Sequence, residues 1–313
     1  MTVATAPGKA ILLGEHAVVY GRPAIAVPVT QVEARANVEE GLAGHGVTIV
    51  AADLGREFEP SRLDAADREA LALARTVANT LSRLGQPSDP DLRITVSSTV
   101  PMARGLGSGA AVATALVRAL AAHYGGYLTA RDVSDLVYET EILHHGTPSG
   151  IDNTVIAFGK PLFFVRGERD EVFWLGRPFW LVIGDTGVPS STREAVAGVR
   201  RQWETDRTAY EARFDAIGVL VERGRQAMAA GNLAELGQVM DEDQAELRAI
   251  GVSSPPLERL IGAARAAGAL GAKLSGSGCG GNMIALTADD ARQRIRSALL
   301  AAGARGVIVT QVS

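Results

Sequence analysis

Hydrophobic and polar residues follow different periods on the two sides of a glycine-rich segment. Residues 92–100 are apolar at every second position, a pattern that predicts a half-buried strand. Apolar residues at helical spacing over 110–124 predict a helix that begins directly after the glycines. The glycine-rich segment 101–111 is therefore expected to join a strand to a helix.

The same two periods predict the other elements of the chain. Strands are expected at 11–13, 163–173, 180–184, 282–286 and 307–312, with strands in a hairpin arrangement over 32–59. Helices are expected over 63–84, 129–144 (with Thr129 as N-cap), 217–230, 233–250 and 255–267, from a capping box at Ser191 to about residue 214, and from Thr287 to about residue 303. Residues 145–153 are expected to form a compact turn, and residues 273–281 a second glycine-rich loop.

Length, charge and cysteine content limit the class of protein. A chain of 313 residues is longer than one compact core commonly allows, so we expect two domains, 1–178 and 179–313, the second a small α+β domain. The net charge of −4, without a basic tract, argues against a nucleic-acid partner. The single cysteine, Cys279, excludes an intrachain disulfide and a cysteine-based zinc or iron–sulfur site. We expect a cytoplasmic protein with no membrane partner, because neither a signal peptide nor an uninterrupted apolar run is present.

The junction between strand and helix at 101–111 suits an anion. Glycines let the backbone approach a phosphate closely, and the first amides of a helix point outward at the positive end of its dipole. Ser108, expected just before the helix, could cap it or turn its hydroxyl towards a metal. The spacing matches neither the dinucleotide fingerprint nor a Walker loop. An ordinary tight turn and a phosphate site are equally compatible with these residues.

Other polar residues could complete a phosphoryl-transfer site. Glu15 and His16 lie between two apolar segments, where a charged pair can tie a turn together or contact a ligand. Phosphoryl transfer needs a metal held by oxygen atoms, a cation and a group that orients the attacking hydroxyl. Ser108 with a helix-terminal glutamate could hold Mg²⁺, while Lys9 could be the cation and Asp152 the base.

Four stretches of the chain resemble the GHMP kinase superfamily and, within it, the mevalonate kinase family. They are Pro-Gly-Lys through Gly-Glu-His-Ala-Val-Val-Tyr-Gly over 7–21, Gly-Leu-Gly-Ser over 105–108, His-Gly-Thr-Pro-Ser-Gly-Ile-Asp-Asn over 145–153, and Lys-Leu-Ser-Gly-Ser-Gly over 273–278. The glycine-rich loops are typical of the superfamily, whereas the first and third stretches are similar to mevalonate kinases. Asp-Thr-Gly at 185–187, followed by Ser191 and Thr192, is similar to that family too.

The resemblance implies a fold and a reaction. The fold would be α+β, a two-domain GHMP kinase fold with a ribosomal-protein-S5-domain-2-like N-terminal domain that binds ATP, a ferredoxin-like C-terminal domain, and the active site between them. The reaction would be the ATP- and Mg²⁺-dependent phosphorylation of the primary hydroxyl of mevalonate, with mevalonate and ATP as small-molecule partners. Homodimers are common among similar enzymes, and the resemblance leaves a homodimer open. The alternatives are a kinase for phosphomevalonate, homoserine or a sugar, a related decarboxylase, and a ligand-sensing module without catalysis.

The resemblance also implies a role for individual residues. Asp152 would be the catalytic aspartate facing the substrate hydroxyl, with Lys9 close to it, and Ser108 and Glu141 would hold Mg²⁺. ATP would be bound by Pro101, Gly105, Leu106, Gly107, Ser108, Gly109, Ala110 and Ala111. The mevalonate pocket would be lined by Glu15, His16, Ser149, Gly150 and Thr192.

Two positions depart from the pattern of the family. Gly109 follows Ser108 where family members commonly have a second serine, so one phosphate or cap contact worth about 1 kcal/mol is lost. Cys279 stands in the last loop where the usual residue is glycine, and we expect it to fill a place too small for a large side chain. Neither departure affects Lys9, Ser108, Glu141 or Asp152.

Overall fold

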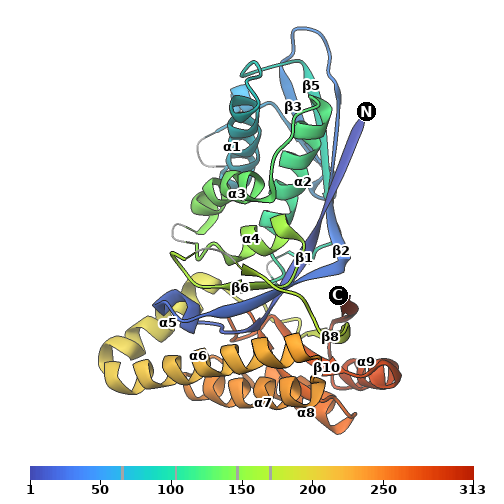
Figure 1. Ribbon diagram of the computed structural model, residues 1–313. Coiled ribbons are helices and arrows are strands. Elements are labelled where there is room, and N and C mark those ends of the chain that lie inside the picture. The colour runs from blue at the N-terminus through green and yellow to red at the C-terminus, as the bar shows by residue number, and fades with distance from the viewer. Residues whose placement is uncertain (65–66, 103, 146–147, 169–170) are drawn as a thin grey trace. The chain divides into compact units, whose positions relative to one another are not determined.

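The structure is a computed structural model that describes residues 1–64, 67–102, 104–145, 148–168 and 171–313 (Figure 1). By its contacts the chain divides into two compact units, each built from separate stretches of sequence. Unit 1 consists of Met1–Gly8, Val32–Pro101 and Gly107–Gly159, and unit 2 of Lys9–Gln31, Met102–Leu106 and Lys160–Ser313. The single domain boundary expected at residue 178 remains a prediction.

The sheet of unit 1 brings together strands that are distant in sequence. Its strands are β3 (Val47–Ala51), β4 (Arg56–Phe58) and β5 (Leu92–Ser98), together with residues 2–8 of β1 (Thr2–Leu13) and residues 32–40 of β2 (Ala24–Glu40). β2 pairs antiparallel with β5, from Ala34 opposite Ser98 to Glu40 opposite Leu92, while β3 runs parallel to β5. The hairpin expected over 32–59 is therefore limited to β3 and β4, which pair antiparallel.

Helices α1 (Arg68–Arg83), α2 (Ser108–His123), α3 (Ala130–His145) and α4 (Ile151–Phe158) complete unit 1. α2 packs on β5 and against α1, α3 and α4, and Figure 1 shows α1, α2 and α3 grouped beside the strands. The buried face of α2 consists largely of alanines, which allow neighbouring helices to approach closely.

Two helix starts in unit 1 are explained by side-chain caps. Asp67 accepts a hydrogen bond from the Ala70 amide, so α1 begins five residues later than the apolar spacing from residue 63 predicted. Thr129 accepts one from the Asp132 amide at 3.1 Å, which confirms Thr129 as the N-cap of α3.

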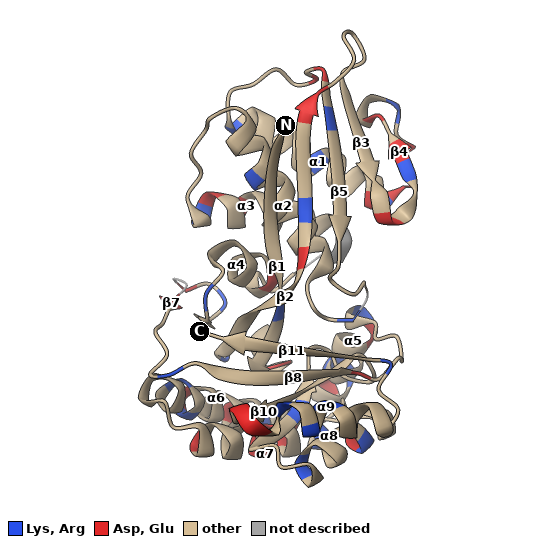
Figure 2. Ribbon diagram, turned by 90° about the vertical axis from the view of Figure 1, so that its right-hand side faces the viewer, with Lys and Arg blue, Asp and Glu red and all other residues tan. Residues whose placement is uncertain are grey.

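Unit 2 has a four-stranded antiparallel sheet in the order β11-β8-β10-β9. The strands are β8 (Phe179–Asp185), β9 (Gly271–Ser275), β10 (Asn282–Thr287) and β11 (Gly306–Val312). α7 (Leu233–Ala249) and α8 (Pro255–Ala266) pack on the β9 side, and α9 (Arg292–Ala301) packs on β8 and β11. Figure 2 shows this layer of helices on one face of the sheet. The short strands β6 (Leu162–Phe164) and β7 (Glu171–Val172) pair with each other, and β6 pairs with residues 24–26 of β2.

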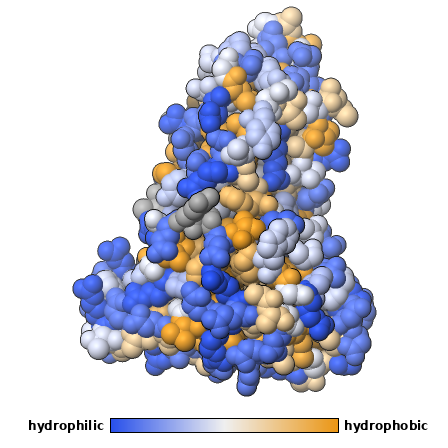
Figure 3. Space-filling model, viewed as in Figure 1, coloured by the Kyte–Doolittle hydropathy of each residue, from blue (hydrophilic) through white to orange (hydrophobic). Residues whose placement is uncertain are grey.

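The helix expected from Ser191 to about residue 214 is two helices, α5 (Thr192–Thr205) and α6 (Arg207–Ala230). Asp206 lies between them and accepts a hydrogen bond from the Ala209 amide at 3.1 Å, so it caps α6. The expected cap of α5 is present, because Ser191 accepts a hydrogen bond from the Glu194 amide. None of the described helices is long and apolar enough to cross a membrane. On the face shown in Figure 3, hydrophilic residues cover most of the surface over α5, α6 and α7.

Candidate active site

β1 ends at Leu13, and the chain then turns sharply to present Glu15 and His16. Gly14 has a φ of +96°, and a Cβ on it would lie 2.6 Å from the Cα of Ala24, so only glycine fits this turn. His16 also lies in the left-handed region, at φ +61°, which is uncommon for a residue with a side chain. The turn buries both the carboxylate and the imidazole.

The imidazole of His16 is held as a neutral hydrogen-bond donor. Its Nε2 lies 3.0 Å from the carbonyl oxygen of Ser277, and because a carbonyl can only accept, Nε2 carries the hydrogen. Burial lowers the pKa of His16 to about 4, although the bond to Ser277 opposes this shift. At neutral pH the Nδ1 atom is therefore an acceptor, which suits a substrate hydroxyl rather than a carboxylate.

Glu15 belongs to a buried cluster of three charged side chains. Lys273 of β9 contacts the Oε1 of Glu15, and its Nζ lies 3.3 Å from the Oδ2 of Asp243 on α7. Glu15 is 1 % exposed, and the other two are 0 % exposed. Burial raises the pKa of Glu15 to about 7 and also raises that of Asp243, against the attraction of the lysine.

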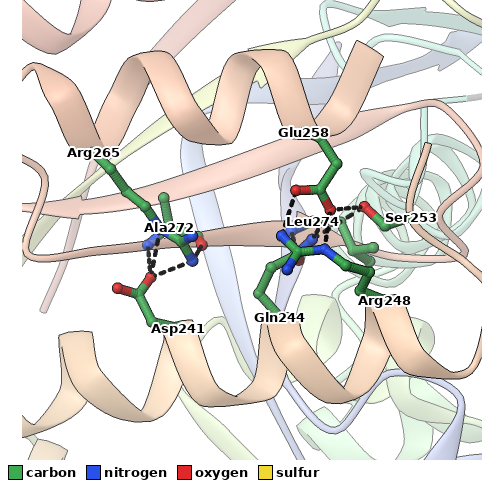
Figure 4. Close-up of polar contacts among 8 residues, drawn as sticks. All are labelled: Asp241, Gln244, Arg248, Ser253, Glu258, Arg265, Ala272 and Leu274. Atoms are coloured by element: carbon green, nitrogen blue, oxygen red, sulfur yellow. Dashed lines mark hydrogen bonds and ion pairs between the residues drawn. The ribbon is translucent and has the colours of Figure 1, made fainter. Parts of the chain in front are cut away.

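β9 carries Lys273 and is the edge strand of the sheet among the described residues, and side chains of α7 and α8 bond its outer edge (Figure 4). The Ala272 amide donates to Asp241, and the Ala272 carbonyl accepts from Arg265, both at 2.9 Å. The Leu274 amide donates to Gln244, also at 2.9 Å. Glu258 accepts further bonds from Gln244, Arg248 and Ser253. α7 and α8 thus satisfy the edge of β9 and hold Lys273 in place.

The two glycine-rich segments meet within unit 2. A Cβ on Gly105 would lie 4.0 Å from the carbonyl oxygen of Ser275, and one on Gly276 would lie 3.9 Å from the Cα of Gly105. The backbone amide of Lys9 donates to the Leu106 carbonyl at 3.0 Å. Lys9, whose side chain is 3 % exposed, is therefore adjacent to the segment that was expected to bind ATP. The loop expected over 273–281 begins only after Ser275, since residues 273–275 end β9.

Residues 185–192 lie beside the last glycine-rich loop. Thr186 Oγ1 donates to the Gly281 carbonyl at 2.8 Å, and Ser190 Oγ lies 2.7 Å from Ser277 Oγ. Ser190 is a polar residue of this region that sequence reasoning missed, because only its spacing to the Asp-Thr-Gly motif would have indicated it. Thr192 is exposed and is the first residue of α5.

α2 begins at Ser108, two residues before the start expected from the apolar spacing over 110–124. Gly107, in the left-handed region at φ +72°, is the N-cap, so the half-buried Ser108 is the first helical residue and does not cap the helix. The Ala111 amide donates to the Gly107 carbonyl at 2.9 Å, so this amide is used within the helix, and a contact of Ala111 with ATP remains a prediction. The amides of residues 108–110 precede the helical hydrogen bonds and point from the positive end of the helix dipole.

The segment expected as a compact turn at 145–153 contains the start of a helix, and Asp152 lies in the first turn of α4. Asn153 donates to the carbonyl and hydroxyl of Ser134 on α3, and Arg118 donates to the Ala157 carbonyl at the other end of α4. These bonds fix α4, which carries the half-buried Asp152 in its first turn, at the positive end of the helix dipole. Gly146 and Thr147 of the motif lie outside the described residues.

Ser149 and Gly150 form the entry to α4. Gly150 is its N-cap at φ +95°, and Ser149 Oγ accepts a hydrogen bond from the Ile151 amide at 3.4 Å. Glu141 is 4 % exposed near the end of α3, where the helix dipole disfavours a carboxylate.

Within the described ranges, no group of three or more His, Cys, Asp or Glu side chains could hold a metal ion. A nucleotide-bound Mg²⁺ needs fewer protein ligands, because phosphate oxygens and waters complete its coordination shell. The Ser108 hydroxyl and the Glu141 carboxylate are hard oxygen donors of the kind that Mg²⁺ prefers, so the donor set fits. Ser108, Glu141 and Asp152 belong to unit 1, whereas Lys9, Glu15, His16 and Thr192 belong to unit 2.

Known proteins similar to this chain cover both units. Residues 71–160 match the family model of the GHMP kinases N terminal domain, and residues 225–305 match that of the GHMP kinases C terminal domain. The mevalonate kinases of Pyrococcus furiosus and Thermococcus sibiricus are 34 % and 36 % identical to the chain, each over 99 % of it and 96 % of their own length. The crystal structure of L. major mevalonate kinase in complex with R-mevalonate has a TM-score of 0.85 and 28 % identity, covering 100 % of this chain and 96 % of that one.

Proposed function

Because the chain belongs to the GHMP kinases and, within them, to the mevalonate kinase family, we propose that it transfers the γ-phosphoryl group of ATP to the primary hydroxyl of mevalonate, giving 5-phosphomevalonate and ADP. The observation that carries the proposal is the similarity to mevalonate kinases over 99 % of the chain. It extends over residues 9–16, which lie outside both matched family models.

Asp152 orients the substrate hydroxyl in this proposal. Asp152 lies in the first turn of α4, and the carboxylate of an aspartate is by its nature a weak base. A weak base suffices when the transition state is loose, because positioning of the hydroxyl then matters more than early removal of its proton. The buried Lys9 stabilises the charge that develops on the transferred phosphoryl group.

The start of α2 binds the phosphates of ATP. The amides of Ser108, Gly109 and Ala110 are oriented for an anion, and Pro101, Gly105, Leu106 and Gly107 shape the segment that leads to them. Ser108 and Glu141 would hold Mg²⁺, which when bound neutralises charge on the phosphates. The carboxylate of Glu141 at the end of α3 supports this assignment, since a cation offsets its unfavourable position.

Mevalonate binds against His16, with Ser149, Gly150 and Thr192 as further contacts. The neutral His16 offers Nδ1 as an acceptor for a mevalonate hydroxyl. Glu15 takes part through its position beside His16, because its own carboxylate contacts Lys273. A cytoplasmic location and a homodimer remain predictions.

The test is ADP release measured with mevalonate, phosphomevalonate, homoserine and galactose as acceptors. We expect turnover with mevalonate and none with the other three. Turnover of phosphomevalonate without turnover of mevalonate would refute the proposal. No feature of the described residues favours one of the other acceptors.

A further inference from the structure

The buried cluster of Glu15, Asp243 and Lys273 has two acids and one base. If all three side chains were ionised, the cluster would carry a net charge of −1 with no more than 1 % of any side chain exposed. His16 lies within the electrostatic influence of Lys273, and burial keeps its imidazole neutral. A buried uncompensated charge is so unfavourable that a group takes up a proton instead. Burial accordingly raises the pKa of Glu15 to about 7 and raises that of Asp243 as well.

Of the three side chains in this cluster, Glu15 is the one whose backbone can shift most easily. Lys273 is on β9, whose edge is fixed by Asp241, Gln244 and Arg265, and Asp243 is on the regular helix α7. Glu15 is followed by His16, whose backbone has the strained φ of +61°. Repulsion between the two carboxylates is therefore relieved at the turn, and a shift of Glu15 moves His16 with it.

We propose that Asp243 is a positioning residue of the mevalonate site, and that one proton held between Asp243 and Glu15 keeps His16 in its binding position. The proposal rests on the proposed function for the part that concerns mevalonate. Asp243 itself lies outside the motifs that indicated the family. Loss of the proton leaves two carboxylates beside one lysine. Their repulsion then shifts the turn that presents Glu15 and His16.

The first test is the variant Asp243→Asn, which keeps the shape of the side chain and removes its charge. In the wild type we expect the KM for mevalonate to rise about tenfold between pH 6 and pH 8, the equivalent of one lost hydrogen bond. In Asp243→Asn the Glu15–Lys273 pair is neutral overall, so the KM stays constant over that range. The KM for ATP stays constant in both proteins.

The matched control is Glu242→Gln, which also replaces a carboxylate of α7 by an amide. Glu242 is exposed and pairs with Arg223 of α6 at 2.6 Å, away from the cluster, so this variant keeps the pH profile of the wild type. A wild-type profile in Asp243→Asn, or a flat profile in Glu242→Gln, overturns the proposal.

A second measurement needs no substrate. A carboxyl group whose pKa is raised by folding stabilises the folded state at low pH. For Glu15 this stabilisation is complete below the ordinary pKa of 4.5 and is lost as the pH rises through the folded-state pKa of about 7. Urea unfolding should therefore show the stability of Asp243→Asn increasing relative to the wild type between pH 5 and pH 8. A constant difference overturns the shared proton. If the wild type does not phosphorylate mevalonate, the proposed function fails, while unfolding still decides whether the proton exists.

Discussion

The Nε2 atom of His16 lies 3.0 Å from the carbonyl oxygen of Ser277, 261 residues further along the chain. This bond joins the turn after β1 to the glycine-rich loop between β9 and β10, and both belong to unit 2. It fixes the tautomer of the imidazole and leaves Nδ1 as the acceptor. The tautomer of His16 is thus determined by a backbone group rather than by another titratable side chain.

We predict that His16 stays neutral from pH 8 down to about pH 5, because burial lowers its pKa to about 4. Nitrogen-15 NMR of the imidazoles should show one of the five histidines as an Nε2–H tautomer throughout this range. Its signal is assigned by its absence in His16→Asn, since asparagine tolerates the left-handed backbone. An imidazole assigned to His16 that titrates near pH 6.5 would contradict this prediction.

The same pKa has a consequence for stability. The unfolded chain binds a proton at His16 near pH 6.5, whereas the folded chain does so only near pH 4. The contribution of neutral His16 is therefore present above pH 6.5 and is lost as pH falls towards 4. The free energy of unfolding of the wild type, taken relative to His16→Asn, should decrease over this interval. A difference that does not change with pH would show that His16 is not buried as a neutral group.

We predict that Asp152→Asn lowers kcat by a factor of about 10² to 10⁴ with little change in either KM, since the carboxylate acts on the reacting hydroxyl. Lys9→Met should also act mainly on kcat, because the lysine stabilises charge in the transition state. Asp135→Asn is the control, because Asp135 is an exposed aspartate on α3 that pairs with Arg131 on its own helix. Steady-state kinetics of the three variants measure kcat and both KM values. A loss of less than about tenfold in kcat for Asp152→Asn would show that Asp152 does not act on the reacting hydroxyl.

Local patterns predicted the strand, glycine turn and helix over 92–124, because alternation, glycine and helical spacing each act within a few residues. The family and the roles of Lys9, Ser108, Glu141 and Asp152 came from the resemblance of motifs rather than from any such pattern. α4 was missed because glycine and proline precede it and its eight residues are too few to show helical periodicity. The break between α5 and α6 was missed because Asp206 interrupts the helix without glycine or proline.

The buried cluster could not be predicted from any local pattern. Lys273 and Glu15 are 258 residues apart, and each stands in a glycine-containing motif that suggests a ligand. Asp243 follows an aspartate and a glutamate on a helix, which is typical of a solvent-exposed face. Its complete burial is a result of tertiary packing against β9.

Cys279 provides a prediction about stability. Its φ is +59° and its side chain is exposed, so the expectation of a tightly enclosed position was wrong and the constraint is the backbone conformation. We predict that Cys279→Gly stabilises the protein by about 1 kcal/mol, the relief of left-handed strain less the extra entropy of glycine in the unfolded chain. The Cys279 amide donates to the Val252 carbonyl at 2.7 Å, and this bond remains in the variant.

The control for this prediction is Cys279→Ser, which keeps a side chain of similar size and the same backbone strain. Its urea midpoint should equal that of the wild type. A lower midpoint for Cys279→Gly would show that the side chain contributes a contact that outweighs the strain.

A comparison of Gly14 and Gly21 separates two reasons why a glycine can be required for stability, the strain of a left-handed backbone and the lack of space for a side chain. Both lie in the left-handed region, at φ +96° and +81°, but a Cβ on Gly14 would lie 2.6 Å from the backbone of Ala24, whereas one on Gly21 would meet nothing within 4 Å. We predict that Gly21→Ala costs about 1 to 2 kcal/mol, the strain alone. Gly14→Ala should cost about 3 kcal/mol or more, since the strand β2 must also move. Urea unfolding at constant pH measures both variants. Equal losses of stability would show that space at Gly14 is not the constraint, and that the turn presenting Glu15 and His16 can be formed with a side chain at this position.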